Sequence, residues 1–214
     1  MIKLYSYFRS SASYRVRAAL YWKQLEFEYI PVHLVKDGGM QNTPEFRKIN
    51  PMGHVPAIEH NGFVLSESMA IIQYLDDISP TAPLFPLVPE NKARAIQIAE
   101  LVNSGIQPLQ NLKVQKLLEQ TYHLPKSDSD GFVRHWIEDG FNNLEKLLNQ
   151  TAGTYCVGAD VTVADCFVVP QCLTARRFGV DVDNYPNIAR VNANALKLPA
   201  FQKAHPEQQP DFAK

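Results

Sequence analysis

A proline-rich segment divides this chain into two parts with different patterns. Four prolines stand between residues 79 and 89, and no helix persists through such a segment because proline lacks a backbone N–H and clashes with the preceding turn. Strand-like and helical stretches alternate before this segment, and strand signals disappear after it. The sequence therefore predicts an N-terminal domain over residues 1–79, a linker over 80–90 and an all-helical domain over 91–214.

The N-terminal part has the pattern of a thioredoxin-like α/β domain. Strand patterns cover residues 2–7, 26–32, 56–59 and 63–65, and helical patterns cover residues 13–23, 43–49 and 66–78. The dipeptide Asn61-Gly62 between the last two strands is a strong hairpin signal. The order β-α-β-α-β-β-α permits a mixed four-stranded sheet, built from one βαβ unit followed by a hairpin.

The C-terminal part is helical throughout. Helical patterns cover residues 92–121, with a bend at Pro108, and then 132–148, 161–173, 186–196 and 199–204. The stretch 161–173 is apolar nearly all round, which is typical of a central helix packed on every side. At its start, the spacing of Thr162 and Asp165 predicts a capping box. This structural role explains Asp165 without a catalytic one.

Charge and cysteine usage exclude several classes of function. The net charge is −1, from 21 basic and 22 acidic residues mixed along the chain, which is unlike the basic field of a nucleic-acid binder. No apolar run approaches the ~18 residues of a membrane span. The three cysteines form no CxxC pair, so a zinc site or disulfide framework is not expected. We expect no metal, and a cytoplasmic protein whose cysteines are core residues.

The first helix begins with a cluster of hydroxyl side chains. Ser10, Ser11 and Ser13 lie where the strand over residues 2–7 gives way to the helix over 13–23. Unpaired backbone N–H groups and the helix dipole favour negative charge at such a place. The anion could be the thiolate of a bound thiol. The alternative is a serine N-cap with a structural role alone.

Two later segments favour a peptide ligand at the same end of the domain. Pro56 stands at the mouth of a strand, where a cis bond would turn the backbone of Val55 outward and offer a strand edge to an extended peptide. The sequence leaves cis or trans open. Ser66 is expected to cap the following helix, which places Ser68 in its first turn and Glu67 where it could pair with an ammonium group. Together these features indicate an amphoteric peptide that carries an anionic group.

Six segments, taken in order, resemble one known family over essentially the full length. They are YSYFRSSASYRVRAAL, NPMGHVPAI, SESMAIIQYL, GIQPLQN, AGTYCVGADVTVADC and VPQ followed by ARRFGVD. The chain resembles the zeta class of glutathione transferases, the family that includes maleylacetoacetate isomerase and the bacterial maleylpyruvate isomerases. The resemblance implies the glutathione transferase fold, with glutathione as cofactor and a homodimer as the assembly.

The resemblance also implies roles for individual residues toward glutathione. Ser10 would donate a hydrogen bond to the sulfur, with Ser11 and Arg15 beside it. Val55 would pair with the cysteinyl backbone. The γ-glutamyl end and the rest of the pocket would be held by Glu67, Ser68, Gln41, Gln107 and Asn111.

Three arginines match positions proposed to receive substrate carboxylates. These are Arg9, Arg177 and the adjacent Arg176, and successive helical residues are not expected to point the same way. The chain departs from the family pattern at Ala12, where relatives usually have cysteine, so no protein thiol can be essential there. Glu67 replaces a frequent glutamine, and residues 122–130 could reshape one rim of the pocket.

The function implied is glutathione-dependent cis–trans isomerisation of a small dicarboxylate keto compound, maleylacetoacetate or maleylpyruvate, in the catabolism of aromatic amino acids. Lowering a thiol pKa by about two units requires roughly 2.7 kcal/mol, and one hydroxyl donor to an anion supplies about 1.5–3 kcal/mol. Two alternatives stay open. The protein could conjugate glutathione to small electrophiles such as α-haloacids, or it could be a non-enzymatic binding module. The sequence does not decide the physiological substrate.

Overall fold

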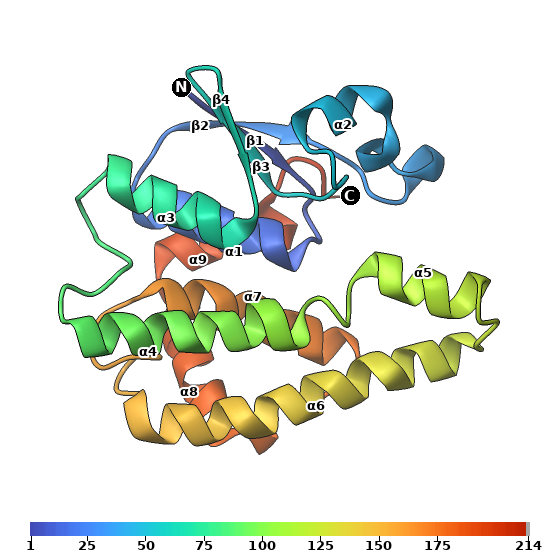
Figure 1. The fold of residues 1–214 in the computed structure, drawn as a ribbon. Coiled ribbons are helices and arrows are strands. Elements are labelled where there is room, and N and C mark those ends of the chain that lie inside the picture. The colour runs from blue at the N-terminus through green and yellow to red at the C-terminus, as the bar shows by residue number, and fades with distance from the viewer. Residues whose placement is uncertain (213–214) are drawn as a thin grey trace. The chain divides into compact units, whose positions relative to one another are not determined.

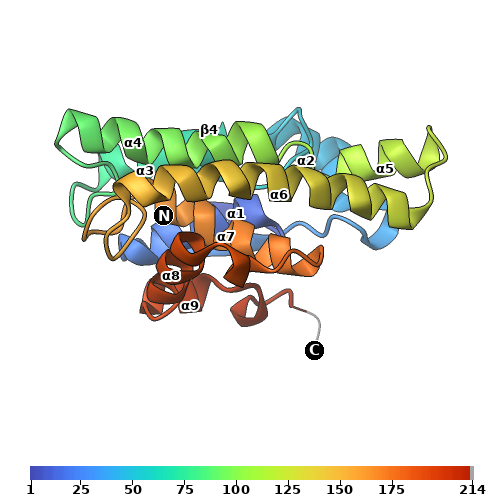
Figure 2. The same ribbon diagram turned by 90° about the horizontal axis from the view of Figure 1, so that it is seen from below.

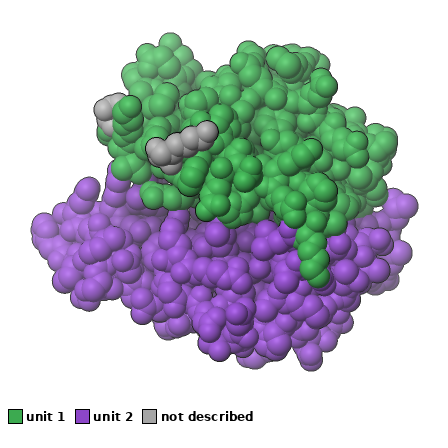
Figure 3. Space-filling model, turned by 180° about the vertical axis from the view of Figure 1, so that it is seen from behind, with its two compact units in different colours: residues 1–85, 197–214 green, residues 86–196 purple. Residues whose placement is uncertain are grey.

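The computed structural model describes residues 1–212, apart from the side chain of Asp37. The chain forms two compact units, coloured separately in Figure 3. One consists of Met1–Phe85 together with the C-terminal segment that begins at Lys197, and the other is Pro86–Leu196. The first unit therefore contains segments from both ends of the described chain.

A mixed four-stranded sheet forms the centre of the first unit. Its strands are β1 (Ile2–Ser6), β2 (Phe27–Pro31), β3 (Ala57–His60) and β4 (Phe63–Ser66), in the order β2-β1-β3-β4. Strands β1 and β2 are parallel, and the other two pairings are antiparallel. Asn61 and Gly62 join β3 to β4 with φ values of 52° and 82°, the left-handed conformation that a tight hairpin turn requires. The predicted thioredoxin-like topology is confirmed.

Helices cover both faces of this sheet. Helix α1 (Ser11–Trp22) and helix α3 (Ser68–Ile78) lie against one face, as Figure 1 shows. Helix α2 (Pro44–Ile49) follows two 3₁₀ turns, Lys36–Gly38 and Met40–Asn42. Alternate residues of a strand point to opposite faces, and the Tyr5 ring packs edge-on against Phe46 of α2 at 6.1 Å. Helix α2 therefore covers the face opposite to α1.

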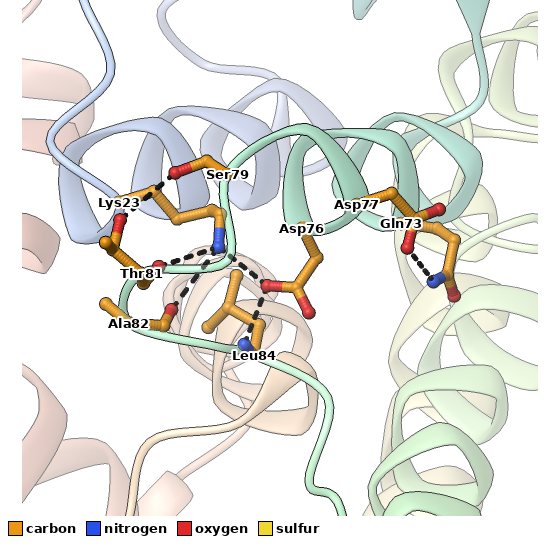
Figure 4. Close-up of polar contacts among 8 residues, drawn as sticks. All are labelled: Lys23, Gln73, Asp76, Asp77, Ser79, Thr81, Ala82 and Leu84. Atoms are coloured by element: carbon orange, nitrogen blue, oxygen red, sulfur yellow. Dashed lines mark hydrogen bonds and ion pairs between the residues drawn. The ribbon is translucent and has the colours of Figure 1, made fainter.

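A buried ion pair joins the C-terminal ends of α1 and α3. The side chain of Lys23 is fully buried, and its Nζ donates to Asp76 Oδ1 at 2.7 Å. The same nitrogen donates to the carbonyl oxygens of Thr81 and Ala82, and Asp76 Oδ1 accepts the backbone N–H of Leu84 (Figure 4). One ion pair therefore fixes both helices and the start of the proline-rich segment.

The second unit is a bundle of helices. These are α4 (Pro89–Glu100), a π-helical segment Leu101–Ile106, α5 (Leu112–Gln120), α6 (Lys126–Thr151), α7 (Val163–Arg177), a 3₁₀ turn Val182–Asn184 and α8 (Pro186–Ala195). Helices α4 and α6 lie next to each other in Figures 1 and 2. The sequence predicted one bent helix over residues 92–121. That prediction is wrong, because the backbone leaves the helix between Gln107 and Asn111.

Helix α7 is the buried centre of this bundle. The predicted capping box of Thr162 and Asp165 is present, and the Asp165 carboxylate accepts the backbone N–H groups of Thr162 and Cys156 at 2.9 and 3.0 Å. Burial raises the pKa of Asp165, and these hydrogen bonds oppose the rise. Asp165 is therefore occupied in holding the helix start.

The last helix belongs to the first unit. Helix α9 (Pro199–Ala204) packs on α1, and a 3₁₀ turn, Pro206–Gln208, follows it. Among residues 1–212, no helix combines the length and the hydropathy of a membrane span. Cys156, Cys166 and Cys172 are buried free thiols.

Candidate functional site

A tight turn connects β1 to α1 and places Ser10 at the start of the helix. The backbone N–H of Ser10 donates to the carbonyl of Tyr7 at 3.0 Å, which closes the turn. The Ser10 hydroxyl oxygen accepts the backbone N–H of Ser13 at 3.1 Å and so caps α1. A hydroxyl that accepts one hydrogen bond keeps its own hydrogen to donate. Ser10 can therefore serve as N-cap and as a donor to an anion together.

The first turn of α1 carries no acidic residue. The positive end of the helix dipole is thus not neutralised by the helix itself. Ser11 is half-buried beside Ser10 and presents a second hydroxyl at the same helix start. This part of the first unit has the properties of an anion site.

Helix α3 begins with an unusual backbone conformation. Glu67 occupies the N-cap position with φ 71° and ψ 117°, and no side chain caps the helix. The predicted cap at Ser66 is wrong, because Ser66 pairs in strand β4 and the helix starts two residues later at Ser68. A non-glycine residue at positive φ costs of order 1–3 kcal/mol, and such residues cluster at ligand clamps. Glu67 is exposed, so its carboxylate can reach a ligand.

A buried arginine links the two helix starts. Arg15 is 1% exposed, and its Nη1 donates to Ser68 Oγ at 3.0 Å. The Lys23–Asp76 ion pair lies eight residues further along both helices. Eight helical residues span about 12 Å, so the two contacts show that α1 and α3 run side by side in the same direction. Their N-terminal ends therefore lie together at one side of the first unit.

A cis proline lies in the loop that approaches this site. The bond Val55–Pro56 is cis, which answers the question that the sequence left open. Val55 is buried in a cluster with Tyr7, Val32 and Phe46. Because Tyr7 begins the turn that ends at Ser10, this packing sets the cis-proline loop beside that turn.

Gln41 provides an additional polar atom in the first unit. Its side chain is 8% exposed, and its Nε2 donates to the carbonyl of Leu34 at 3.1 Å. Its Oε1 is buried and accepts no hydrogen bond from the described residues. A buried acceptor is costly unless a donor satisfies it. The contact of Gln41 with a ligand stays a prediction.

The remaining predicted residues lie on the second unit or on the surface. Gln107 directly follows the π-helical segment, and Asn111 caps α5 by accepting the N–H of Lys113. Arg176 and Arg177 end α7 and are both exposed. Arg176 is 3.8 Å from the carboxylate of Asp183, and the Arg177 guanidinium lies over the Phe178 ring. Their contact with a ligand stays a prediction.

Arg9 lies in the turn of the first unit and is also exposed. It precedes Ser10 directly, so it stands close along the chain to the candidate anion site. Its role toward a substrate carboxylate stays a prediction as well.

Sequence reasoning missed a second buried arginine. Arg17 is 0% exposed and donates to Ser6 Oγ and to the carbonyl oxygens of Tyr7, Phe8 and Ala204, at 3.0–3.3 Å. Burial lowers its pKa to about 10. No motif signals this role, because three of the four acceptors are backbone carbonyls, which any residue provides.

Comparison with known proteins gives consistent matches over both units. Residues 1–77 match the glutathione S-transferase N-terminal domain, and residues 112–203 match the C-terminal domain. Maleylacetoacetate isomerase of Rattus norvegicus is 46% identical over 208 residues, which cover 97% of this chain and 94% of that protein. The holo structure of a bacterial maleylpyruvate isomerase, described as a zeta-class glutathione S-transferase, is 37% identical with a TM-score of 0.95, over 99% of this chain and 100% of that one.

The chain belongs to the zeta class of glutathione transferases. Another solved structure, maleylacetoacetate isomerase of Anaeromyxobacter dehalogenans, contains glutathione in its active site. It is 38% identical, with a TM-score of 0.89 over 100% of this chain and 98% of that one. The family's expected fold, a thioredoxin-like domain followed by a helical domain, is the fold found here.

Proposed function

We propose that this protein is a glutathione-dependent cis–trans isomerase that acts on maleylacetoacetate or maleylpyruvate. The observation that carries the proposal is the start of α1. There a serine hydroxyl with a hydrogen to donate lies at an uncompensated helix N-terminus, in a chain 46% identical to a maleylacetoacetate isomerase.

When bound, glutathione supplies a thiolate that adds reversibly to the double bond of the substrate and leaves again unchanged. Ser10 donates its O–H to the sulfur and favours the ionised form. This contribution is about 1.5–3 kcal/mol, and the dipole of α1 adds up to about 1 kcal/mol. Ser11 lies beside Ser10, and Arg15 holds the α3 start against α1 through Ser68. No protein thiol is available at position 12, because Ala12 stands where relatives usually have cysteine.

The peptide part of glutathione is held by groups of the first unit. Ser68 and the α3 start receive the γ-glutamyl carboxylate, since a helix N-terminus favours an anion. Glu67 pairs with the ammonium group, and the backbone of Val55 pairs with the cysteinyl residue. Gln41 offers its buried acceptor oxygen. Gln107 and Asn111, which belong to the second unit, are candidates for glutathione contacts on the family resemblance alone.

Arginines receive the two carboxylates of the substrate. A guanidinium binds a planar carboxylate through two parallel hydrogen bonds. We assign this role to Arg9 and Arg177, which are exposed. Arg176 is the third candidate, and its guanidinium lies 3.8 Å from the carboxylate of Asp183.

The test measures isomerisation of maleylacetone and maleylpyruvate side by side, with and without glutathione. We expect turnover only with glutathione and no net consumption of free glutathione. Turnover without glutathione, or no turnover of either compound, would refute the proposal. Glutathione binding is measured separately by isothermal titration, and no heat at millimolar ligand would instead favour a non-enzymatic binding module.

A second function uses the same thiolate. Conjugation of glutathione to small electrophiles such as α-haloacids requires the Ser10 donor and no additional group. The two reactions differ in product, because conjugation consumes glutathione in proportion to the electrophile. Measuring free glutathione during each reaction separates them.

The assembly and location are also proposals. The family resemblance implies a homodimer, which sedimentation of the purified protein tests directly. The buried free thiols of Cys156, Cys166 and Cys172 are compatible with a reducing cytoplasm.

A further inference from the structure

The turn that presents Ser10 is held from both sides at one residue, Phe8. The backbone N–H of Phe8 donates to Asp211 Oδ2 at 3.0 Å. Its carbonyl oxygen accepts a hydrogen bond from Arg17 Nη2, also at 3.0 Å. Both backbone polar groups of this turn residue are therefore bound to side chains rather than to the sheet.

The C-terminal segment of the first unit provides the contact to the N–H of Phe8. Asp211 belongs to it, and its second carboxylate oxygen accepts the hydroxyl of Tyr29 at 2.7 Å. The Phe212 ring packs edge-on against the Phe8 ring, with centroids 5.5 Å apart. The carboxylate is thus fixed by β2 on one side and by the turn on the other.

Arg17 connects the turn to the same segment. Its Nε donates to the carbonyl of Ala204 at 3.0 Å, while its two terminal nitrogens hold the turn and β1. One helix turn earlier, the hydroxyl of Tyr14 donates to the carbonyl of Phe201 at 3.0 Å. The segment is therefore fastened along α1 as well as at Phe8.

We propose that the C-terminal segment from Lys197 to Phe212 clamps the β1–α1 turn, and that Asp211 is a positioning residue for Ser10. Asp211 acts through Phe8 and the turn that closes between Tyr7 and Ser10. This proposal rests on the proposed function for its effect on catalysis. It adds to that function a residue about 200 positions away from Ser10 along the chain.

The effect on catalysis follows from the narrow range of distances over which a hydrogen bond acts. A hydroxyl stabilises a sulfur anion only within hydrogen-bond distance, and a displacement of about 1 Å can cost ~10²-fold in rate. Ser10 follows Phe8 by two residues, so freeing the N–H of Phe8 allows the turn to move. The segment thereby maintains the geometry of a group that it does not contact.

The test compares Asp211→Ala with Asp211→Asn and Tyr14→Phe. Asp211→Ala removes both acceptors. Asp211→Asn keeps the shape, since its amide oxygen can accept from Phe8 and its amide nitrogen can donate to the Tyr29 hydroxyl. Tyr14→Phe removes a contact between the same segment and α1 without touching Phe8. It is the matched control for loosening the segment in general.

Two readouts are used. Hydrogen exchange of the backbone amides of residues 10–13 in the ligand-free protein reports the turn itself. Isothermal titration with glutathione and the pH dependence of the bound thiol's absorbance report the site.

We expect Asp211→Ala to accelerate exchange about tenfold, weaken glutathione binding about tenfold and raise the pKa of the bound thiol. We expect Asp211→Asn and Tyr14→Phe to stay within about threefold of the parent in all three. Should Asp211→Ala not fold, Tyr29→Phe is expected to give a smaller change of the same sign, because it releases only one side of the carboxylate.

The proposal is overturned if Asp211→Ala, or Tyr29→Phe in its place, leaves exchange and binding at parent values. It is equally overturned if Tyr14→Phe matches Asp211→Ala, because then general loosening explains both. If the parent protein binds no glutathione, the proposed function is refuted instead. The exchange experiment needs no ligand and would still decide whether the clamp exists.

Discussion

Two helix starts in this protein, those of α1 and α7, meet the same electrostatic requirement in opposite ways. Each helix begins with unpaired N–H groups at the positive end of a dipole. In α7, Asp165 supplies the negative charge from the first turn of the helix and binds the N–H groups of Thr162 and Cys156. In α1, no acidic residue is present in the first turn, and Ser10 satisfies only Ser13.

The difference separates a structural end from a functional one. The α7 start is buried and complete, so it contributes stability and has no place for a ligand. The α1 start leaves its positive end for an anion from outside. The lack of a first-turn acid is not sufficient evidence of binding, because α5, α8 and α9 lack one as well. The α1 start is distinguished by the Ser10 hydroxyl, which keeps a hydrogen to donate.

The largest effect is expected on stability, from a substitution at the start of α7. Asp165→Ala leaves two buried N–H groups without acceptors, at about 1–3 kcal/mol each, so the free energy of unfolding should fall by about 3–5 kcal/mol. Urea unfolding measures it. Asp160→Ala, at an exposed acid just before the helix, is the control and should change little. A loss below about 1.5 kcal/mol for Asp165→Ala would contradict the assigned role.

The second effect concerns the incomplete start. Ser10→Ala and Ser10→Gly both remove the donor, and each should lower isomerase turnover by ~10²-fold, the scale of losing one oxyanion-type donor. Glycine is a tolerable N-cap, so only the alanine variant should lose about 1 kcal/mol of stability. Steady-state kinetics and urea unfolding are measured on both. Recovery of turnover in Ser10→Gly would show that Ser10 serves only as a cap.

The third effect comes from giving the α1 start an acidic residue in its first turn, as the α7 start has. Ala12→Asp places a carboxylate in the first turn of α1, where it should stabilise the helix by about 0.5 kcal/mol. The same charge should weaken glutathione binding by about tenfold, because like charges repel. Ala12→Asn is the neutral control of equal size. Equal glutathione affinities of the two variants would show that the absence of an acidic residue at this helix start does not affect binding.

The smallest effect is expected for alkylation of the three cysteines in the folded protein. Burial raises the pKa of the Cys172 thiol to about 12 and that of Cys156 well above its ordinary value. At pH 8 the thiolate fraction of Cys172 is then about 10⁻⁴, and iodoacetamide should leave the native protein unmodified while it labels all three cysteines in urea. Mass spectrometry gives the readout. Rapid native labelling would show that a protein thiol is available after all.

Much of the fold follows from local patterns. The Asn61-Gly62 hairpin and the capping box of α7 were predicted, because each depends on residues a few positions apart. The start of α3 was misplaced by two residues. Ser66 has a good capping side chain, but its pairing with Ala57 in the sheet decides its conformation, and sheet pairing is a long-range contact.

The candidate site could be predicted only in part for the same reason. Ser10 and Ser68 were found through helix-start chemistry, whereas Arg17 and Asp211 were not. Both residues bind backbone groups of Phe8, and Arg17 also binds the carbonyl of Ala204. A backbone donor or acceptor leaves no trace in residue type. A helix was predicted over residues 199–204, but no pattern indicated that it packs on α1.

The bond between Phe8 and Asp211 joins residues 203 positions apart, and this has a consequence for synthesis. A ribosome adds about 5–20 residues per second, so roughly 10–40 s pass between the two. Throughout that time β1 and α1 are already made, yet the bend between them lacks one of its partners. The portion of the protein that is translated first is completed last, and a nascent chain holds the sequence of its active turn long before it holds the shape.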